Sequence, residues 1–341
     1  MVQKYKLSDL KDAIQESYNL FICSASFETR CLSIAKSINK KAIQRAMIIY
    51  NSECLSYIGA NKESLLNIFT DKSNSVEFKQ SDPIFSADNV IISLTELNKK
   101  DDILSILLDI TTFTHEMLLI LLRIFPIVCP NAEITCIYAN ASEYHPNAYV
   151  PNGEDNENDA ANKKWLSKGV VEIRSVLGYS GNILPLQKTH LIVIVGYEHE
   201  RAASIIKALE PNSLALGYGR PDNATTEKDK EANEQYLELT RQMAVSYDHI
   251  DTFDITCDDP FKTFEKISEM VSSQEGKNVL IVPLNNKIST IGVAFTAIKD
   301  SNIQLCYAPA LIYNYTDYST PGSNCYVFKI SQFIRSMGEQ K

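Results

Sequence analysis

Two acidic–basic motifs contain residues that could do chemistry. Each follows a hydrophobic run and an aromatic residue: Glu28 and Arg30 lie in FETR, and Glu198 and Arg201 lie in YEHER. An arginine in such a loop can hold an anion, and a carboxylate beside it can act as an acid or a base. The alternative is structural, because a glutamate in the first helical turn favours the helix dipole and a nearby arginine can pair with it. Both interpretations stay open at this point.

Two serines precede the first motif. Ser24 and Ser26 lie between the run NLFIC and the helix that we expect to begin close to Glu28. Backbone amides at a helix N-terminus, together with adjacent hydroxyls, suit a phosphate or another anion. The alternative is that Ser26 caps the helix. Both serines are candidate ligand-binding residues.

A second hydroxyl-rich loop has the sequence DITTFTHEM. Asp109 ends an apolar run, and Thr111, Thr114 and His115 follow it before a long apolar helix. Threonine hydroxyls and turn amides can hold a phosphate or a ribose. A structural role would place Thr114 as the N-cap of the helix and Asp109 as the anchor of the turn.

This loop resembles a loop of CARF domains, the Rossmann-like sensors of cyclic oligonucleotides in bacterial defence. The residues that match the D-I-T-x-x-T-x-x-M pattern are Asp109, Thr111, Thr114 and Met117. Thr112 and Phe113 stand where that loop has two glycines. The related SAVED sensors fuse two such units in one chain. The resemblance implies a Rossmann-like fold, a nucleotide ligand, and ligand contacts at Ser24 and Ser26 in the first strand–helix loop.

The motifs recur along the chain in the same order, which indicates an internal duplication. Glu198 stands 170 positions after Glu28, and Cys306 stands 170 positions after Cys136. An Asp-Pro pair stands before an expected helix in each half, and the segment ILLDITTFT corresponds to LIVPLNNKIST. The sequence therefore predicts two copies of one unit.

The duplication adds two further candidates. In the second copy, the loop that corresponds to DITTFT carries Asn285 and Lys287. An amide and an ammonium group can both bind an anion. Asn285 and Lys287 therefore join the candidate ligand-binding residues.

The pattern of apolar runs predicts an α/β fold. Runs such as LIVIV and VLIVPL are continuous, which is typical of strands in a parallel sheet that is covered on both faces. Because these strands alternate with helices, we expect two tandem Rossmann-like units with mainly parallel sheets. The first unit is expected at 1–165, ending in a polar surface loop at 151–165, and the second at 166–341.

Composition excludes several function classes. The net charge of −9 argues against duplex-DNA binding, which requires a basic face. The eight cysteines show no CxxC spacing, so we expect reduced thiols in the cytoplasm and no metal site. No G-x-G-x-x-G or P-loop pattern occurs, so no cofactor is expected. The longest apolar stretch, at 117–128, is too short to cross a membrane.

Three function hypotheses follow from these features. The first is a sensing or binding protein of a bacterial defence or stress system, which holds a small anionic or nucleotide-like ligand at the candidate residues. The second is a hydrolase or transferase that acts on a nucleotide or sugar-nucleotide, with Glu28 and Asp109 as its catalytic residues. The third is a non-catalytic scaffold subunit that binds a protein of the same operon. The absence of a recognisable catalytic signature favours binding over catalysis, and we expect a homo-oligomer.

Overall fold

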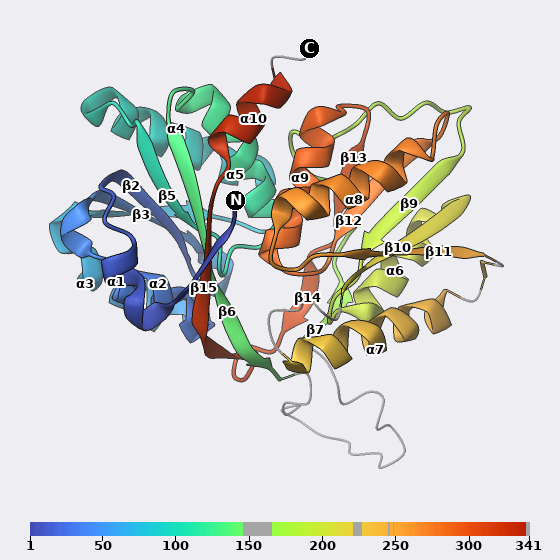
Figure 1. Ribbon diagram of the computed structural model, residues 1–341, viewed down its shortest axis with the longest axis horizontal. Coiled ribbons are helices and arrows are strands. Elements are labelled where there is room, and N and C mark those ends of the chain that lie inside the picture. The colour runs from blue at the N-terminus through green and yellow to red at the C-terminus, as the bar shows by residue number, and fades with distance from the viewer. Residues whose placement is uncertain (146–165, 221–226, 245, 248, 339–341) are drawn as a thin grey trace. The chain divides into compact units, whose positions relative to one another are not determined.

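The computed structural model describes residues 1–145, 166–220, 227–244, 246–247 and 249–338 (Figure 1). The expected polar loop at 151–165 lies outside these residues. The chain forms two compact units: the first comprises Met1–Ala141 and Pro321–Lys341, and the second comprises Ser142–Thr320. The boundary between the units that the sequence predicted lies after residue 165. That boundary places Pro321–Lys341 in the second unit, whereas in the structure this segment belongs to the first.

The first unit is built on a seven-stranded sheet with the order β1-β15-β6-β5-β2-β3-β4. Its strands are β1 (Gln3–Lys6), β2 (Tyr18–Ala25), β3 (Ile43–Asn51), β4 (Ser73–Phe78), β5 (Ser105–Asp109), β6 (Glu133–Tyr144) and β15 (Ser319–Lys329). Strands β6, β5, β2, β3 and β4 run parallel to one another, and β1 pairs antiparallel with β15. The last strand of the chain therefore completes the sheet of the first unit.

Helices connect the parallel strands of the first unit. The helices are α1 (Leu10–Ala13), α2 (Ser33–Ser37), α3 (Leu55–Phe69), α4 (Pro83–Asp101), α5 (His115–Val128) and α10 (Ser331–Gly338). The 3-10 turns are η1 (Leu7–Asp9), η2 (Thr29–Leu32), η3 (Lys40–Ala42), η4 (Ser52–Cys54) and η5 (Thr70–Lys72). Helix α2 packs against α3, and α4 packs against α5. The segment FETRCLSIAKSI, expected to be one helix, is the turn η2 followed by the short helix α2.

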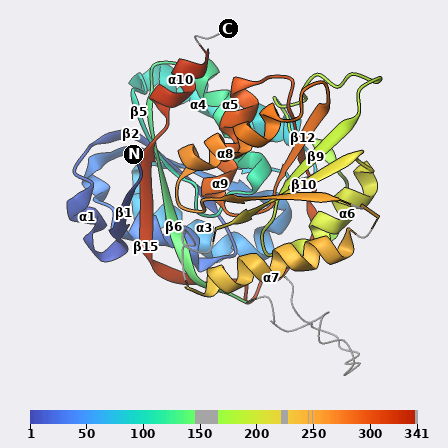
Figure 2. The ribbon, with the colours of Figure 1, turned by 45° about the vertical axis from the view of Figure 1, so that its right-hand side comes forward.

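The second unit is built on a six-stranded sheet with the order β11-β10-β9-β12-β13-β8. Its strands are β7 (Ser167–Val170), β8 (Arg174–Ser175), β9 (Thr189–Ile194), β10 (Ser213–Gly219), β11 (Ile250–Ile255), β12 (Asn278–Pro283), β13 (Gln304–Tyr307) and β14 (Ala310–Tyr313). Its helices are α6 (His199–Leu209), α7 (Glu227–Met243), α8 (Pro260–Ser272) and α9 (Lys287–Lys299). Strand β8 runs antiparallel to β13, and β7 pairs antiparallel with β14 in a separate two-stranded sheet. Figure 1 and Figure 2 both show α8 lying against α9.

The two units share one strand topology. Within each unit the five parallel strands lie in the order third, second, first, fourth, fifth, which is the order of a Rossmann-like unit. In the first unit this order is β4-β3-β2-β5-β6, and in the second it is β11-β10-β9-β12-β13. The predicted fold class, two tandem Rossmann-like units with mainly parallel sheets, is confirmed.

The central strands are buried on both faces, as the continuous apolar runs predicted. Every residue of β12 is buried, and Ile106, Leu107 and Leu108 of β5 are at most 1% exposed.

Both Asp-Pro pairs begin a helix. Asp82 caps α4 and Asp259 caps α8, each through a carboxylate oxygen that accepts backbone N–H bonds. No helix in the described part of the chain combines the length and the apolar character needed to cross a membrane.

Candidate functional site

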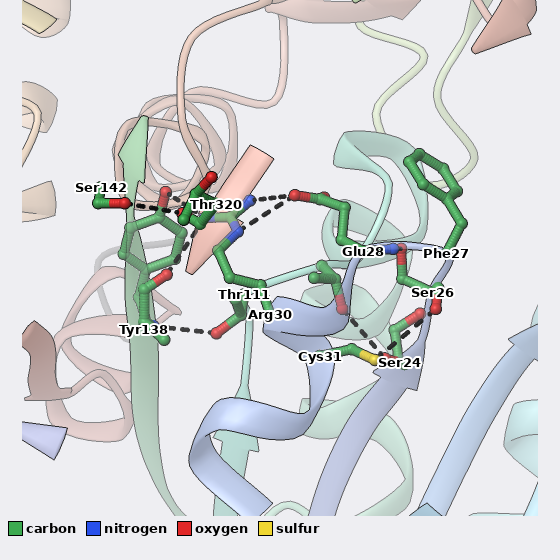
Figure 3. A network of polar contacts seen from close by, with 12 residues as sticks. Ser24, Ser26, Phe27, Glu28, Arg30, Cys31, Thr111, Tyr138, Ser142 and Thr320 are labelled. Carbon is green, nitrogen blue, oxygen red and sulfur yellow. Dashed lines mark hydrogen bonds and ion pairs between the residues drawn. The ribbon is translucent and has the colours of Figure 1, made fainter. Parts of the chain in front are cut away.

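The first acidic–basic motif forms a buried ion pair (Figure 3). The Nε and Nη2 atoms of Arg30 donate to Oε2 of Glu28 at 3.1 and 2.9 Å. The exposed fractions of the Arg30 and Glu28 side chains are 3% and 8%. The turn η2 brings the two side chains together, because it curls the chain immediately after Glu28. The motif is thus part of the interior of the first unit.

The Arg30 guanidinium also contacts the fifth parallel strand of its unit. Its Nη1 atom donates to the carbonyl of Ala139 at 3.2 Å and to Oη of Tyr138 at 3.4 Å. The guanidinium carbon lies 5.9 Å from the centre of the Tyr138 ring. All three guanidinium nitrogens of Arg30 therefore have protein partners.

The buried carboxyl group of Asp109 lies close to this ion pair. One of its oxygens accepts bonds from the backbone N–H of Thr111, at 3.0 Å, and from the Thr111 hydroxyl. The Thr111 hydroxyl oxygen in turn accepts the N–H of Ala139 at 3.0 Å. Burial raises the pKa of Asp109 to about 7, although the bonds from Thr111 and the charge of Arg30 oppose this rise. A group with such a pKa can exchange protons near neutrality.

The remaining hydroxyls of the first unit bind backbone groups. Ser26 Oγ accepts the N–H of Glu28 at 3.3 Å, and Thr112 Oγ1 donates to the carbonyl of Ser24 at 3.0 Å. The bond from Thr112 joins the loop after β5 to the last residues of β2, between the strands where a Rossmann-like sheet usually opens a crevice. Ser24 Oγ donates to the Ala25 carbonyl at 3.5 Å.

The start of α5 carries the last two candidates of the first unit. Thr114 is the N-cap of the helix and accepts the N–H of Met117 at 3.1 Å. His115 is the first helical residue and is 6% exposed. Thr114 therefore has the structural role that the sequence analysis gave as one of its two alternatives. Ligand binding by the candidate residues of the first unit stays a prediction.

The second acidic–basic motif forms the same kind of pair in the second unit. Arg201 Nη2 contacts Oε2 of Glu198, and the Ser167 hydroxyl donates to the other carboxylate oxygen. The side chains of Arg201 and Glu198 are 4% and 8% exposed. The guanidinium carbon of Arg201 lies 5.9 Å from the centre of the Tyr307 ring. The motif is again folded into the interior of its unit.

The sheet registers show that Tyr138 and Tyr307 are equivalent. In the first unit Ile22 lies beside Leu108, and Leu108 lies beside Cys136. In the second unit the corresponding row is Ile192, Ile281 and Leu305. The two tyrosines stand two residues after Cys136 and Leu305, respectively. Glu28, Arg30 and Tyr138 therefore form a trio that recurs as Glu198, Arg201 and Tyr307.

This register corrects the sequence alignment in one detail. Cys306 was matched with Cys136, but the residue equivalent to Cys136 is Leu305. The two tyrosines were not among the candidate residues. The signal that could have found them is the Tyr-Ala pair that follows the apolar run of each fifth strand, in CIYA and in LCYA.

The loop after β12 is held by amide side chains. Asn285 donates from Nδ2 to the carbonyl of Val195 at 2.6 Å, and Asn286 caps α9. A Cβ atom on Gly196 would lie 2.2 Å from the carbonyl oxygen of Leu284, so the loops after β9 and β12 are in backbone contact. Lys287 is the first residue of α9. The chain segments that follow the first and fourth strands are thus in direct contact in the second unit, and a hydrogen bond from Thr112 to Ser24 joins the equivalent segments in the first.

The described residues contain no group of three or more His, Cys, Asp or Glu side chains that could hold a metal ion. All eight cysteines carry free thiols. Burial raises the pKa of the Cys31 thiol to about 12 and that of Cys129 to about 11. Neither of these two thiols is activated as a nucleophile at neutral pH.

The chain matches no protein-family model and no curated protein. The cytoplasmic domain of a prokaryotic cation chloride cotransporter is 10% identical, with 86% of this chain and 96% of that chain covered, at a TM-score of 0.23. A UDP-N-acetylglucosamine 2-epimerase is 11% identical, with 83% and 87% covered, at a TM-score of 0.24. The UDP-GlcNAc 2-epimerase from Neisseria meningitidis bound to UDP-GlcNAc is 10% identical, with 77% and 76% covered, at a TM-score of 0.21. Similarities this low carry no information about function, which has to be argued from the site.

Proposed function

We propose that this chain is a binding protein for a nucleotide-like anion, of the kind that senses a small ligand in a bacterial defence or stress system. The observation that carries the proposal is the trio of glutamate, arginine and tyrosine, which recurs at the same place in both units. That place is the carboxyl edge of a parallel sheet, where open α/β sheets bind their ligands. The nucleotide class and the biological setting rest on the resemblance of the loop at Asp109.

The energetics of buried ion pairs support a role beyond stability. Removing two charges from water costs several kcal/mol per ion, and replacing a buried pair by apolar residues is often neutral or stabilising. A fold that needed only packing at these two places could therefore use apolar side chains. An arginine held beside a tyrosine ring keeps a permanent positive charge at the sheet edge, and such a charge is suited to a phosphate.

Isothermal titration calorimetry with the full chain tests this function. The panel contains cyclic di-, tri- and tetranucleotides, nucleoside mono- and triphosphates, and UDP-N-acetylglucosamine. We expect binding heat with one nucleotide class and none with the matching nucleosides. If no member of the panel produces heat, the proposed function is wrong.

A second candidate function is catalysis on a nucleotide or sugar-nucleotide. It is favoured by Asp109, whose carboxyl group combines a pKa of about 7 with a place beside the Glu28–Arg30 pair. Incubation of the protein with the same panel, followed by chromatography, would reveal a product. Catalysis at this group predicts turnover by the wild type and none by Asp109→Asn, with Asp102→Asn at the exposed end of α4 as the control. Turnover by Asp109→Asn at the wild-type rate would rule out this role.

A further inference from the structure

The two arginines of the repeated trio differ in how many of their donors are used. Arg30 uses all three guanidinium nitrogens within the first unit. Arg201 is 5% exposed, and its Nε and Nη1 atoms have no hydrogen-bond partner among the described residues. Leaving a buried N–H group without a hydrogen-bond partner destabilises the folded state, and more so when the group is charged. The second unit therefore holds two donors that its own side chains do not satisfy.

The local fold explains this difference. In the first unit β6 continues past Tyr138, so the carbonyl of Ala139 faces Nη1 of Arg30. In the second unit β13 ends at Tyr307, and the chain turns at once into β14. The spacing also differs, because Arg30 follows its glutamate by two residues and Arg201 by three. The second copy therefore lacks the contact that closes the first.

The surroundings of Arg201 suit an anion. The glutamate Glu198 takes only one of its nitrogens, and a carboxylate oxygen of Glu198 is itself bonded by Ser167. Burial acts to lower the pKa of Arg201, but Glu198 and the phenols of Tyr313, Tyr307 and Tyr318 act against it, and the net effect is a raised pKa. The guanidinium is therefore positively charged at neutral pH.

A row of aromatic rings begins at Tyr318, one of the phenols that act on the pKa of Arg201. We call it the tyrosine row, and its members are Tyr318, Tyr144, Tyr197 and Tyr236. The ring centres of Tyr144 and Tyr197 lie 4.8 Å apart, and those of Tyr144 and Tyr318 lie 6.1 Å apart. These three rings are half-buried, whereas Tyr236 is 3% exposed. Half-buried tyrosine rings offer apolar faces on which a nucleobase can stack.

We propose that the ligand site of this chain lies in the second unit, where Arg201 binds a phosphate group and the tyrosine row stacks the attached base. The inference rests on the proposed function and names its ligand as a nucleoside phosphate. Phosphate oxygens are acceptors only, so they match the two unsatisfied N–H donors of Arg201. Arg30 is the structural counterpart, since its donors are already used.

Calorimetry on the full chain tests the assignment. The probes are the four ribonucleoside 5′-monophosphates, their nucleosides and ribose 5-phosphate. The test variant is the double substitution Glu198→Gln/Arg201→Met, which removes both charges and leaves no unpaired ion. The control variant is Asp101→Asn/Arg45→Met, which removes a partly exposed carboxylate–guanidinium pair from the first unit.

We expect the wild type and the control to bind one monophosphate more tightly than its nucleoside and more tightly than ribose 5-phosphate. In the test variant the affinity for the monophosphate should fall at least about tenfold and approach that of the nucleoside, which corresponds to about 1.4 kcal/mol or more. Near-UV circular dichroism of each variant establishes that it is folded. If the double variant does not fold, Arg201→Lys replaces it, because lysine keeps the charge and loses the planar set of donors.

Three results would overturn the inference. If the test variant binds the monophosphate as tightly as the wild type, Arg201 does not hold the phosphate, and the proposed binding function is unaffected. Equal affinities for ribose 5-phosphate and the monophosphate would exclude stacking on the tyrosine row. If the wild type binds none of these probes but binds a cyclic oligonucleotide, the named ligand class is wrong and the broader function stands.

Discussion

At the scale of single residues, the most informative comparison is between Arg30 and Arg201. They have the same neighbours by type, a glutamate and a tyrosine, yet all three nitrogens of Arg30 have protein partners, whereas Nε and Nη1 of Arg201 have none among the residues that the structure describes. The contrast concerns two nitrogens: in Arg30, Nη1 donates to the Ala139 carbonyl and Nε donates to Glu28. The residue types and their order along the chain predicted two similar sites, because a sequence does not show which carbonyl faces which side chain.

In the ion pair of the first unit, the effect of substituting Arg30 on the free energy of unfolding should depend on whether Glu28 is still charged. Arg30→Met leaves the buried Glu28 carboxylate without its partner and should lower the free energy of unfolding by about 3–5 kcal/mol. The double variant Glu28→Gln/Arg30→Met removes both charges and should be clearly more stable than the single variant. Urea unfolding followed by circular dichroism measures both values. If the double variant is as unstable as the single one, burial of an unpaired charge is not the reason for the loss.

The buried carboxyl group of Asp109 should make stability depend on pH. Its pKa is raised to about 7 in the folded chain, whereas an unfolded aspartate has a pKa of about 3.9. Between these values the folded state holds a proton that the unfolded state has lost. The contribution of Asp109 to stability should therefore decrease by about 1.4 kcal/mol per pH unit as pH rises through this window, and level off above pH 7.

This effect has to be measured as a difference, because His190 acts in the opposite direction. Burial lowers the pKa of His190 to about 4, so its contribution to stability is lost as pH falls below about 6.5. The free energy of unfolding of the wild type minus that of Asp109→Asn, measured in urea at pH 5, 6, 7 and 8, isolates the aspartate. A difference that is constant over this range would show that Asp109 is ionised throughout.

At the scale of the helices and strands, the features that local sequence patterns determine were predicted from the sequence. The continuous apolar runs predicted the buried parallel strands, and the Asp-Pro pairs marked the starts of α4 and α8. The pairing of β15 with the first sheet was not predicted, because it joins segments far apart in the chain. The tyrosines of the two trios were missed for a related reason, since their role depends on the register between β5 and β6 or between β12 and β13.

Two glycines provide a matched test of the contact between the loops after β9 and β12. Gly196→Ala would place a methyl group 2.2 Å from the Leu284 carbonyl oxygen, so it should destabilise the chain by about 1–3 kcal/mol. Gly59→Ala, in α3, meets nothing within 4 Å and should stabilise the chain by about 0.5–1 kcal/mol. Thermal unfolding of the two variants measures both effects. A neutral Gly196→Ala would mean that the two loops can separate easily.

At the scale of the whole molecule, the first unit is discontinuous in sequence. It needs Pro321–Lys341, whose residues Cys325, Tyr326 and Phe328 are at most 3% exposed. Burial of each large apolar side chain contributes about 1.5–3 kcal/mol, so loss of this segment would remove most of the stability of an ordinary domain.

A fragment experiment follows from this arrangement. The fragment 1–141 alone should be unfolded or insoluble, because β6 would present an unpaired edge. The same fragment joined to 321–341 by a short Gly/Ser linker should fold, since a Cβ atom on Gly322 would lie 2.3 Å from the Asn140 side chain and the two ends to be joined are close. Circular dichroism and urea unfolding distinguish the two. A well-folded fragment 1–141 would show that β15 is dispensable.

The late position of β15 also sets the order in which the nascent chain can fold. When the ribosome has released residues 142–320, every strand of the second unit's sheet is available, while the first sheet still lacks β15. The unit that is translated second can therefore be completed first. A premature stop codon directly after Thr320 would spare the second unit and leave the first with an open sheet edge, exposed to proteases and to aggregation.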